Sequence, residues 1–346
     1  MTSHRRVAER LAELLGCPFA ELRQSEVEPS QSLGYVVPND TLVSTELAAA
    51  CGIHSEDDLF GGVVPLPFIA TKTISHPLVA AAAAAPAGWK PAFGERVRDF
   101  VLPGLSAFSP EDARSAGRQL LPGGEVRIKL ASGIGGAGQS VARNAGELDA
   151  AVAAIDPADL SRNGLVVERN LARIRTHSIG MLRVGSLQTS YFGTQRNTVS
   201  VHGKEVYGGS SLTLVRGGVD ALARLAPDAG VQRAIAQAEA YHAAALEYFP
   251  GLLVSRCNYD VAEGQDAAGN PFAGVLEQSW RLGGASPAEV EALHALHDDP
   301  ELAFVHASCV EIHGPADALP DDAVVYFAGV DDLLGPITKY ARLHRS

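Results

Sequence analysis

The chain has 346 residues and a formal net charge of −12, from 40 acidic against 28 basic side chains. This length predicts two or three domains of roughly 100–200 residues each, and 46% hydrophobic and 20% charged residues are typical of a folded globular protein. The acidic balance disfavours a general nucleic-acid binder, whose surface would be basic, but it is compatible with a locally positive pocket for a phosphate ligand.

Cysteine usage and apolar runs also limit the function. The four cysteines are far apart without a Cys-x-x-Cys pair, so neither a zinc site nor a disulfide framework is expected. The N-terminus lacks the apolar core of a secretory signal, and the longest apolar run, residues 78–86, is too short to span a bilayer. We therefore expect a cytoplasmic protein that binds neither nucleic acid nor a membrane.

The first part of the chain, residues 1–95, predicts an N-terminal α/β lobe. Apolar residues at helical spacing indicate an amphipathic helix over residues 5–23. Within residues 34–70, the apolar runs GYVVP and GGVVPLPFI flank an Ala-rich helical segment at 44–50, and this β–α–β rhythm favours a parallel sheet. The Ala-, Pro- and Gly-rich stretch 80–91 indicates the connection to the next lobe.

Two further lobes are expected, over residues 96–165 and 166–346. The smaller lobe should contain a helix capped by Ser109, strands at 126–130, 140–143 and 165–167, and a helix at 146–155. The last lobe should contain strand-like alternation over 174–201, a helix at 229–248, strands at 254–261 and 272–278 joined by a turn-rich connection, and a helix capped by Ser286.

A strand followed by a glycine-rich loop marks the first candidate site. The strand delivers Lys129, and the loop contains Gly133, Gly135, Gly136 and Gly138. Glycines let backbone N–H groups approach phosphate oxygens without obstruction by Cβ, and a nearby lysine supplies a positive charge. The loop has neither the GK[ST] ending of a Walker A loop nor the spacing of a dinucleotide fingerprint. A plain glycine hairpin remains the alternative.

Acidic residues stand on three later strands, and the last two of them form the second candidate site. Glu168 ends the apolar run GLVVE, which taken alone favours a solvated acid. Asp260 and Glu277 stand on strands that would pair across a hairpin and face one cavity. Facing carboxylates repel unless a cation lies between them, and Mg²⁺ is held by one or two carboxylates plus substrate phosphates. Arg281 suits a bidentate clamp on a carboxylate or phosphate. A surface hairpin with ordinary charges remains the alternative.

The order of these features resembles the ATP-grasp superfamily over residues 96–310: a strand with lysine, a glycine-rich loop, VVE, an acid, a hairpin and E-x-[NS]-x-R. The resemblance implies an α+β fold, in which two lobes grip ATP and an N-terminal α/β lobe precedes them. The runs TKTISHPL, RIKLASGIGGAGQ and EVYGGSSL are also similar to an uncharacterised bacterial family within this superfamily, which implies a fold and no substrate.

The resemblance gives the first candidate site the role of binding ATP. Lys129 would contact the phosphates, and the loop from Gly133 to Gly138 would close over them. Glu168 would lie beside the adenine and ribose, and the chain through Leu171 would offer backbone contacts to the base.

The second candidate site would hold Mg²⁺ and the reacting phosphate. Asp260 and Glu277 resemble the two carboxylate ligands of the metal, and Arg281 resembles the arginine that holds the phosphate or acyl-phosphate. Ser279 stands where family members usually carry asparagine. A serine oxygen can still bind a cation, but this departure allows a weaker metal site.

Three other residues are candidates with an open alternative. Lys72, in FIATKTISHPL, is the best match to an earlier lysine of the family, at a longer spacing from Lys129 than expected. Arg196, next to Gln195, would receive an anionic substrate or lie on a surface hairpin. His177 would touch the ribose or be a half-buried strand histidine.

The activity implied is ligation that depends on ATP and Mg²⁺. A substrate carboxylate attacks the γ-phosphate, and an amine or thiol then displaces phosphate from the acyl-phosphate. The protein contributes positioning and charge neutralisation. A small-molecule kinase and a non-catalytic nucleotide-binding module stay open as alternatives. The expected partners are a small-molecule carboxylate and an amine or thiol, and a homodimer also stays open.

Overall fold

The computed structural model describes residues 3–22, 34–131, 133, 138–316, 318–331 and 334–344. Its helices are α1 Ser3–Leu15, α2 Thr45–Ala50, α3 Pro91–Val97, α4 Pro110–Leu120, α5 Ala145–Ala153, α6 Pro157–Asn163, α7 Val219–Leu225, α8 Ala229–Tyr248 and α9 Ser286–Asp298, with a 3₁₀ turn η4 at Lys72–Ser75. Its strands are β1 Leu42–Val43, β2 Gly62–Val64, β3 Gly104–Ala107, β4 Val126–Leu130, β5 Gln139–Ala142, β6 Leu165–Arg169, β7 Ala172–Val184, β8 Leu187–Val199, β9 Glu205–Arg216, β10 Leu253–Val254, β11 Arg256–Gln265, β12 Pro271–Ser279, β13 Phe304–His313, β14 Val324–Asp331 and β15 Gly335–His344.

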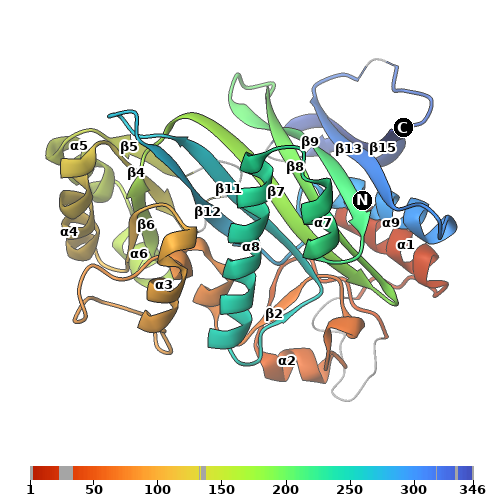
Figure 1. Ribbon diagram of the computed structural model, residues 1–346, viewed down its shortest axis with the longest axis horizontal. Helices are drawn as coiled ribbons and strands as arrows, with labels where there is room; N and C mark the ends of the chain where they lie inside the picture. Colours follow the sequence, from red (N-terminus) through yellow and green to blue (C-terminus); the bar gives the residue numbers. More distant parts are fainter. Residues whose placement is uncertain are drawn as a thin grey trace.

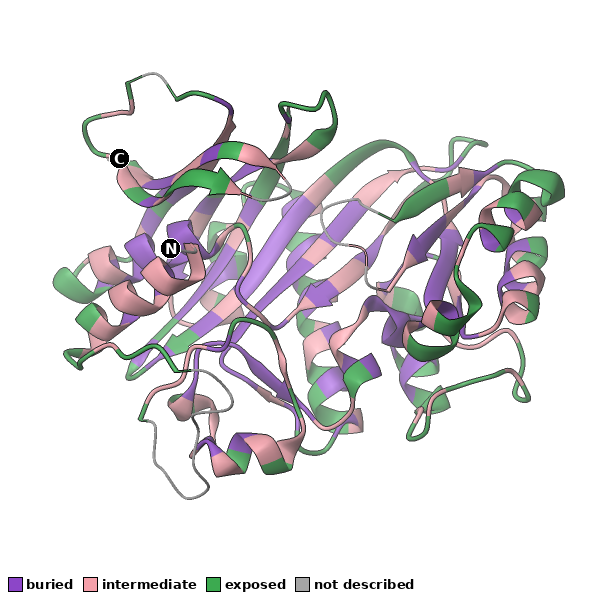
Figure 2. Cartoon of the chain, turned by 180° about the vertical axis from the view of Figure 1, so that it is seen from behind, coloured by how far each residue is buried: buried purple, intermediate pink, exposed green. Residues whose placement is uncertain are grey.

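An eight-stranded sheet forms the centre of the molecule (Figure 1), in the order β12-β11-β7-β8-β9-β13-β15-β14. Neighbouring strands are antiparallel throughout. Helices α7 and α8 cover one face, where Ala238 and Tyr241 of α8 pack with Tyr259 and Val275 of the sheet. Helices α1 and α9 pack on the other face near one end, as the view from behind shows (Figure 2). Part of that second face is therefore left for a site.

Strand β11 shows how alternation separates core residues from site residues. Successive side chains of a strand point to opposite faces of the sheet. Cys257 and Tyr259 point into the core beneath α8, whereas Arg256, Asn258 and Asp260 line a cavity on the opposite face. One strand thus presents three polar groups in a row to the same cavity.

The smaller four-stranded sheet, in the order β3-β6-β4-β5, repeats this division. Val126 and Ile128 of β4 pack with α4 and α5 in a separate apolar core. The residues that alternate with them, Arg127 and Lys129, line a cavity on the other side. This sheet lies at the end of the molecule where β12 and β11 stand (Figure 1), so its polar face and theirs border the same space.

The N-terminal lobe confirms the expected parallel pairing and corrects its first strand. Strands β1 and β2 pair in parallel around α2, and β10 joins β2 antiparallel. The run GYVVP makes only an isolated bridge, between Val36 and Leu59, because Pro38 has no N–H with which to continue a ladder. Helix α1 ends at Leu15 and not at residue 23, since Gly16 adopts a φ of 64° that terminates it.

Two expectations for the later lobes also change. Ser286 is not an N-cap: the cap position is Ala285, which makes no side-chain bond, and the Ser286 Oγ accepts a hydrogen bond from the Gly283 N–H. The expected boundaries at 95/96 and 165/166 fall inside α3 and β6, so we propose domain boundaries at the ends of these elements. None of the helices in the described part of the chain is long and apolar enough to cross a membrane.

Candidate active site

Two cavities meet at Asp260 and Glu277. The first cavity, about 400 Å³, lies between the four-stranded and eight-stranded sheets and is lined by Lys129, Glu168 and Leu171 among others. The second cavity, about 600 Å³, extends from the same two carboxylates toward α1 and the strands near the C-terminus. The residues common to both are Lys72, Gln195, Tyr207, Asp260 and Glu277. A ligand in one cavity can therefore react with a ligand in the other beside this carboxylate pair.

A buried ion pair forms the wall of the first cavity. The Lys129 Nζ lies 2.5 Å from the Glu168 Oε1, and both side chains are almost fully buried. The His76 Nε2 lies 3.5 Å from the Glu168 Oε2, but neither of these atoms has a hydrogen-bond partner in the described chain. Burial alone would raise the pKa of Glu168, but Lys129 and His76 together lower that pKa to about 2. Glu168 is therefore an anion at neutral pH, held between Lys129 and His76.

The space for His76 depends on a glycine. Gly104 of β3 stands directly opposite Glu168 in the register of the sheet. A Cβ at Gly104 would lie 2.7 Å from the His76 ring, which is closer than two such atoms approach. Gly104 therefore lets the imidazole pack beneath the carboxylate.

Lys72 reaches the junction of the two cavities from η4. Its Nζ lies 2.6 Å from the Glu277 Oε2 and donates a hydrogen bond to the Gly133 carbonyl at 3.0 Å. The side chain is 6% exposed. One ammonium thus joins the carboxylate pair to the start of the glycine-rich loop.

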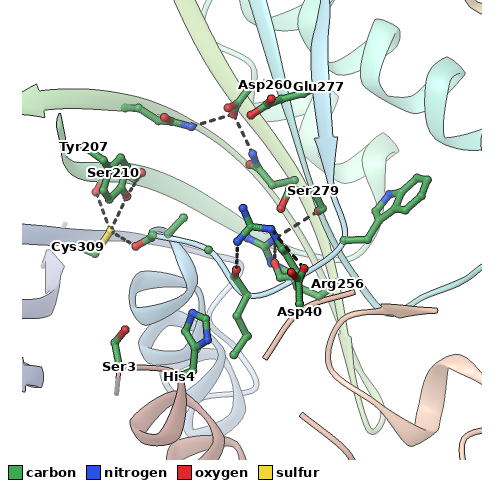
Figure 3. Close-up of a pocket in the computed structure, with 18 of the residues that line it drawn as sticks. Ser3, His4, Asp40, Tyr207, Ser210, Arg256, Asp260, Glu277, Ser279 and Cys309 are labelled. Carbon is green, nitrogen blue, oxygen red and sulfur yellow. Dashed lines mark hydrogen bonds and ion pairs between the residues drawn. The ribbon is translucent and has the colours of Figure 1, made fainter. Parts of the chain in front are cut away.

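Asp260 and Glu277 are directly opposite each other in the β11–β12 register, and their side chains point toward one another (Figure 3). A β-bulge directly follows this pair, a distortion that re-aims side chains next to active sites. Burial and the neighbouring Glu277 raise the pKa of Asp260 above its ordinary value, against the effect of hydrogen-bond donors around it. The pair therefore carries repulsion that a bound cation would remove.

Three side chains hold one oxygen of Asp260. Its Oδ1 accepts hydrogen bonds from the Gln195 Nε2 at 2.8 Å, the Asn258 Nδ2 at 2.9 Å and the Ser178 Oγ at 3.3 Å. These residues come from three neighbouring strands, so the orientation of the carboxylate is fixed by the sheet itself.

A second buried ion pair supports the site from behind. Arg256 forms two bonds to Glu289, from Nη2 at 2.6 Å and from Nε at 3.0 Å, and its Nη1 donates to the Arg281 carbonyl at 2.6 Å. The Tyr191 hydroxyl lies 2.7 Å from Glu289. Arg256 therefore ties α9 to the chain that follows β12 and carries Arg281.

The remaining candidates of the first cavity are placed as follows. The Gly133 N–H bonds to the Leu130 carbonyl, and the Gly138 carbonyl accepts from the Leu130 N–H, so both glycines adjoin the end of β4. Gly135 and Gly136 lie outside the described residues. Leu171 is buried and lines the first cavity.

Ser279 and Arg281 line the second cavity. Ser279 stands opposite Asn258 in the β11–β12 register. The Arg281 Nε lies 3.6 Å from the carboxylate of the exposed Asp40, and its Nη1 donates to the Leu282 carbonyl. Arg281 is thus held loosely at the edge of this cavity.

His177 and Arg196 do not face either cavity. His177 is buried, and its Nε2 lies 3.2 Å from Glu263, whereas the alternate residue Thr176 lines the first cavity. Arg196 is exposed, whereas its neighbour Gln195 lines both cavities. Because side chains alternate along a strand, the residue that faces the cavity is in each case the one directly before the residue that we expected. We withdraw the proposed ribose contact and the proposed anion contact.

Several residues of the site were not expected from the sequence, among them Ser178, Gln195, Arg256 and Asn258. The signal for two of them was the alternation RCNYD in β11, where polar residues occupy every second position. The same period that places Asp260 in the cavity also places Asn258 and Arg256 there. Gln195 and Ser178 lie on long strands without such a signal.

The chain belongs to the family described as "Protein of unknown function (DUF3182)", whose profile matches residues 1–341. Among curated proteins, no sequence matches the chain significantly. Among solved structures, phosphoribosylamine–glycine ligase from Thermotoga maritima is similar, with a TM-score of 0.51, 14% identity, and coverage of 99% of this chain and 89% of that chain. The biotin carboxylase–β,γ-ATP complex from Campylobacter jejuni has a TM-score of 0.48 and 12% identity, over 87% of this chain and 68% of that one.

At these identities the likeness concerns the fold. The similarity to the Thermotoga maritima ligase extends over nearly the whole chain. The α+β ATP-grasp fold expected from the order of the sequence features is confirmed.

Proposed function

We propose that this chain is a ligase that uses ATP and Mg²⁺ to activate a small-molecule carboxylate as an acyl-phosphate for attack by an amine or thiol. The observation that carries the proposal is the meeting of two cavities at Asp260 and Glu277. The first cavity suits a nucleotide, and the second leaves room for the substrates next to the end of its phosphate chain.

The first cavity offers complementary groups to each part of ATP. Lys129 and Lys72 supply positive charge where the phosphates would lie. Glu168 lines this cavity as an anion, and an anionic carboxylate suits a hydrogen-bond donor of the ribose or the base. Leu171 supplies apolar surface to the base.

The carboxylate pair suits Mg²⁺. The described residues contain no cluster of three or more His, Cys, Asp or Glu, which argues against a site built from protein ligands alone. Mg²⁺ instead takes one or two carboxylates together with substrate phosphates, and Asp260 and Glu277 supply these two. When bound, Mg²⁺ would neutralise charge on the transferred phosphoryl group.

The second cavity would hold the carboxylate substrate. Arg281 lies on its wall, and Gly283 and Gly284, which precede α9, line it too. The N-terminal end of a helix and a guanidinium both favour an anion. Lys339 and Glu311, which form an ion pair at 2.8 Å, line the same cavity and offer contacts of both signs to the rest of the substrate.

The proposed reaction has two steps. An oxygen of the substrate carboxylate attacks the γ-phosphorus while the bond from that phosphorus to the β,γ-bridging oxygen breaks, so ADP leaves. The amine or thiol then attacks the acyl carbon, the bond from this carbon to the phosphate oxygen breaks, and the proton of the nucleophile passes to solvent. Lys129, Lys72 and Arg281 hold the phosphates and the carboxylate in line for the first step.

The proposal is tested by a screen of ADP release against pools of amino acids, small carboxylic acids, amines and thiols. We expect release at least about tenfold above background only when a carboxylate and a nucleophile are both present. Release with a hydroxyl compound alone, together with a stable phosphorylated product, would identify a kinase instead. Nucleotide binding without ADP release in any pool would identify a binding module.

A further inference from the structure

Tyr191 has one hydroxyl hydrogen and two acceptors. Its oxygen lies 3.0 Å from the Asn258 Oδ1 and 2.7 Å from the Glu289 Oε1. Glu289 is bound by Arg256 through both oxygens, so its carboxylate is ionised and can only accept. The hydrogen therefore belongs to the shorter, charge-assisted bond to Glu289. This leaves two oxygens, of Tyr191 and Asn258, facing each other without a hydrogen.

At the nitrogen end of the Asn258 amide, hydrogen-bond donors outnumber the lone pairs that accept them. Its Nδ2 donates to the Asp260 Oδ1 at 2.9 Å, and that oxygen also accepts from Gln195 and Ser178. Three donors thus converge on one carboxylate oxygen, which offers two lone pairs. Asp260 would keep two of its donors if the Asn258 amide turned away.

A half-turn of the amide supplies the hydrogen that is missing between the Tyr191 oxygen and Asn258. The amide oxygen and nitrogen have nearly the same size, so a half-turn about χ2 exchanges them without a steric change. The Nδ2 would then donate to the Tyr191 oxygen, whose hydrogen stays with Glu289. The Oδ1 would face the Asp260 Oδ1 at the observed separation of 2.9 Å, and two such oxygens repel unless a cation joins them.

We propose that Asn258 is a ligand of the divalent cation and that its amide turns when the cation binds, which places Oδ1 beside Asp260 as a further ligand oxygen. Two adjacent oxygens of a Mg²⁺ octahedron, each about 2.05 Å from the ion, are about 2.9 Å apart. The separation at Asn258 and Asp260 matches this edge. The inference rests on the proposed function, because it requires a cation at the Asp260–Glu277 pair.

Ser279 provides the comparison, because it is also a candidate ligand of the metal. It stands opposite Asn258 on the neighbouring strand and lines the same second cavity. Its hydroxyl is also an oxygen that a cation could use. The variants Asn258→Leu and Ser279→Ala therefore measure the contributions of the two oxygens separately.

The test is a titration with Mn²⁺, followed by the electron paramagnetic resonance signal of the free ion, on the full chain in the presence of ADP, because the proposed site also takes ligands from the nucleotide phosphates. A titration of ADP alone is subtracted. Asn258→Leu should weaken Mn²⁺ binding by about tenfold or more, on the scale at which residues supporting a metal site act. A loss of Mn²⁺ affinity in Ser279→Ala together with unchanged affinity in Asn258→Leu would contradict the role of Asn258. Asn258→Asp keeps a ligand oxygen and adds charge, so it should bind Mn²⁺ at least as tightly as the parent.

The outcomes separate this inference from the proposed function. Glu277→Gln should also weaken Mn²⁺ binding. An unchanged affinity in Glu277→Gln would refute the metal site itself, whereas a loss in Glu277→Gln together with unchanged binding in Asn258→Leu would refute the role of Asn258 alone. Melting without metal shows whether Asn258→Leu is folded. If it is not, Asn258→Asp decides, and weaker binding in that variant overturns the inference.

Discussion

Glu277→Gln should abolish most turnover while the fold survives. The substitution keeps the shape of the side chain but removes one of two anionic groups that face each other across β11 and β12. With one carboxylate left, Mg²⁺ should bind poorly. Because a metal contributes several kcal/mol to stabilising transition-state charge, and each 1.4 kcal/mol is tenfold, we expect the rate of ADP release to fall at least about a hundredfold.

The fold should tolerate this change for a physical reason. Glu277 repels Asp260 and raises its pKa, so its removal relieves a like-charge contact. Lys72 loses its ion pair with Glu277 but keeps the Gly133 carbonyl as an acceptor. The melting temperature without metal should therefore stay close to that of the parent.

Glu263→Gln is the matched control for Glu277→Gln. Glu263 stands on β11 of the same hairpin but contacts His177 and lines neither cavity. The rate of ADP release by Glu263→Gln, and the dependence of that rate on Mg²⁺, should match those of the parent. Equal rates in Glu277→Gln and the parent would show that Glu277 is not a metal ligand.

Lys129→Met should destabilise the chain by about 3–5 kcal/mol, because it leaves the buried Glu168 carboxylate with only the longer contact to His76. The double substitution Lys129→Met and Glu168→Gln removes both charges and should recover most of this loss. Both free energies are measured by urea unfolding. A loss below about 1 kcal/mol in Lys129→Met, the scale of an exposed pair, would contradict the buried pairing.

The pair also predicts a pH dependence of the parent protein. The folded-state pKa of Glu168 is about 2, below the ordinary value of 4.5. The stability that it contributes is therefore present above pH 4.5 and is lost as the pH falls from 4.5 toward 2. The double variant should lose this part of the acid dependence and keep the rest. An identical acid profile in the parent and the double variant would contradict the lowered pKa.

The double variant also separates binding from folding. It lacks the phosphate-facing ammonium but should remain folded, so its affinity for ATP should fall about ten- to a hundredfold, as expected for a charge-assisted bond of roughly 1.5–3 kcal/mol. Substitution of Lys129 alone cannot answer this question, because a loss of ATP binding would then also follow from unfolding.

The sequence order was enough to predict the fold, and several of the predicted site residues lie together in the structure. Lys129 and Asp260 line one cavity because each alternates with apolar residues of a strand that is covered by helices, and Glu277 stands opposite Asp260 in the β11–β12 register. The prediction failed where alternation was weak. His177 and Arg196 lie on long strands whose polar residues are not regularly spaced. In both strands the residue that faces a cavity is one position before the residue that was predicted.

Other features depend on contacts between distant segments. Lys72 comes from a short 3₁₀ turn, and its contact with Glu277 depends on how that turn packs against β12. The ion pair of Lys129 with Glu168 depends on the pairing of β4 with β6. A role in phosphate binding alone was expected for Lys129, whereas the structure also gives it a partner within the protein.

The most direct test of the nucleotide and metal site is the melting temperature of the parent chain with and without ATP and Mg²⁺. A ligand that binds only the folded state at a hundredfold excess over its Kd stabilises that state by about 2.7 kcal/mol. Millimolar ATP with Mg²⁺ should therefore raise the melting temperature by several degrees, and Glu277→Gln should show a smaller rise. An unchanged melting temperature of the parent in millimolar ATP and Mg²⁺ would contradict nucleotide binding between the two sheets.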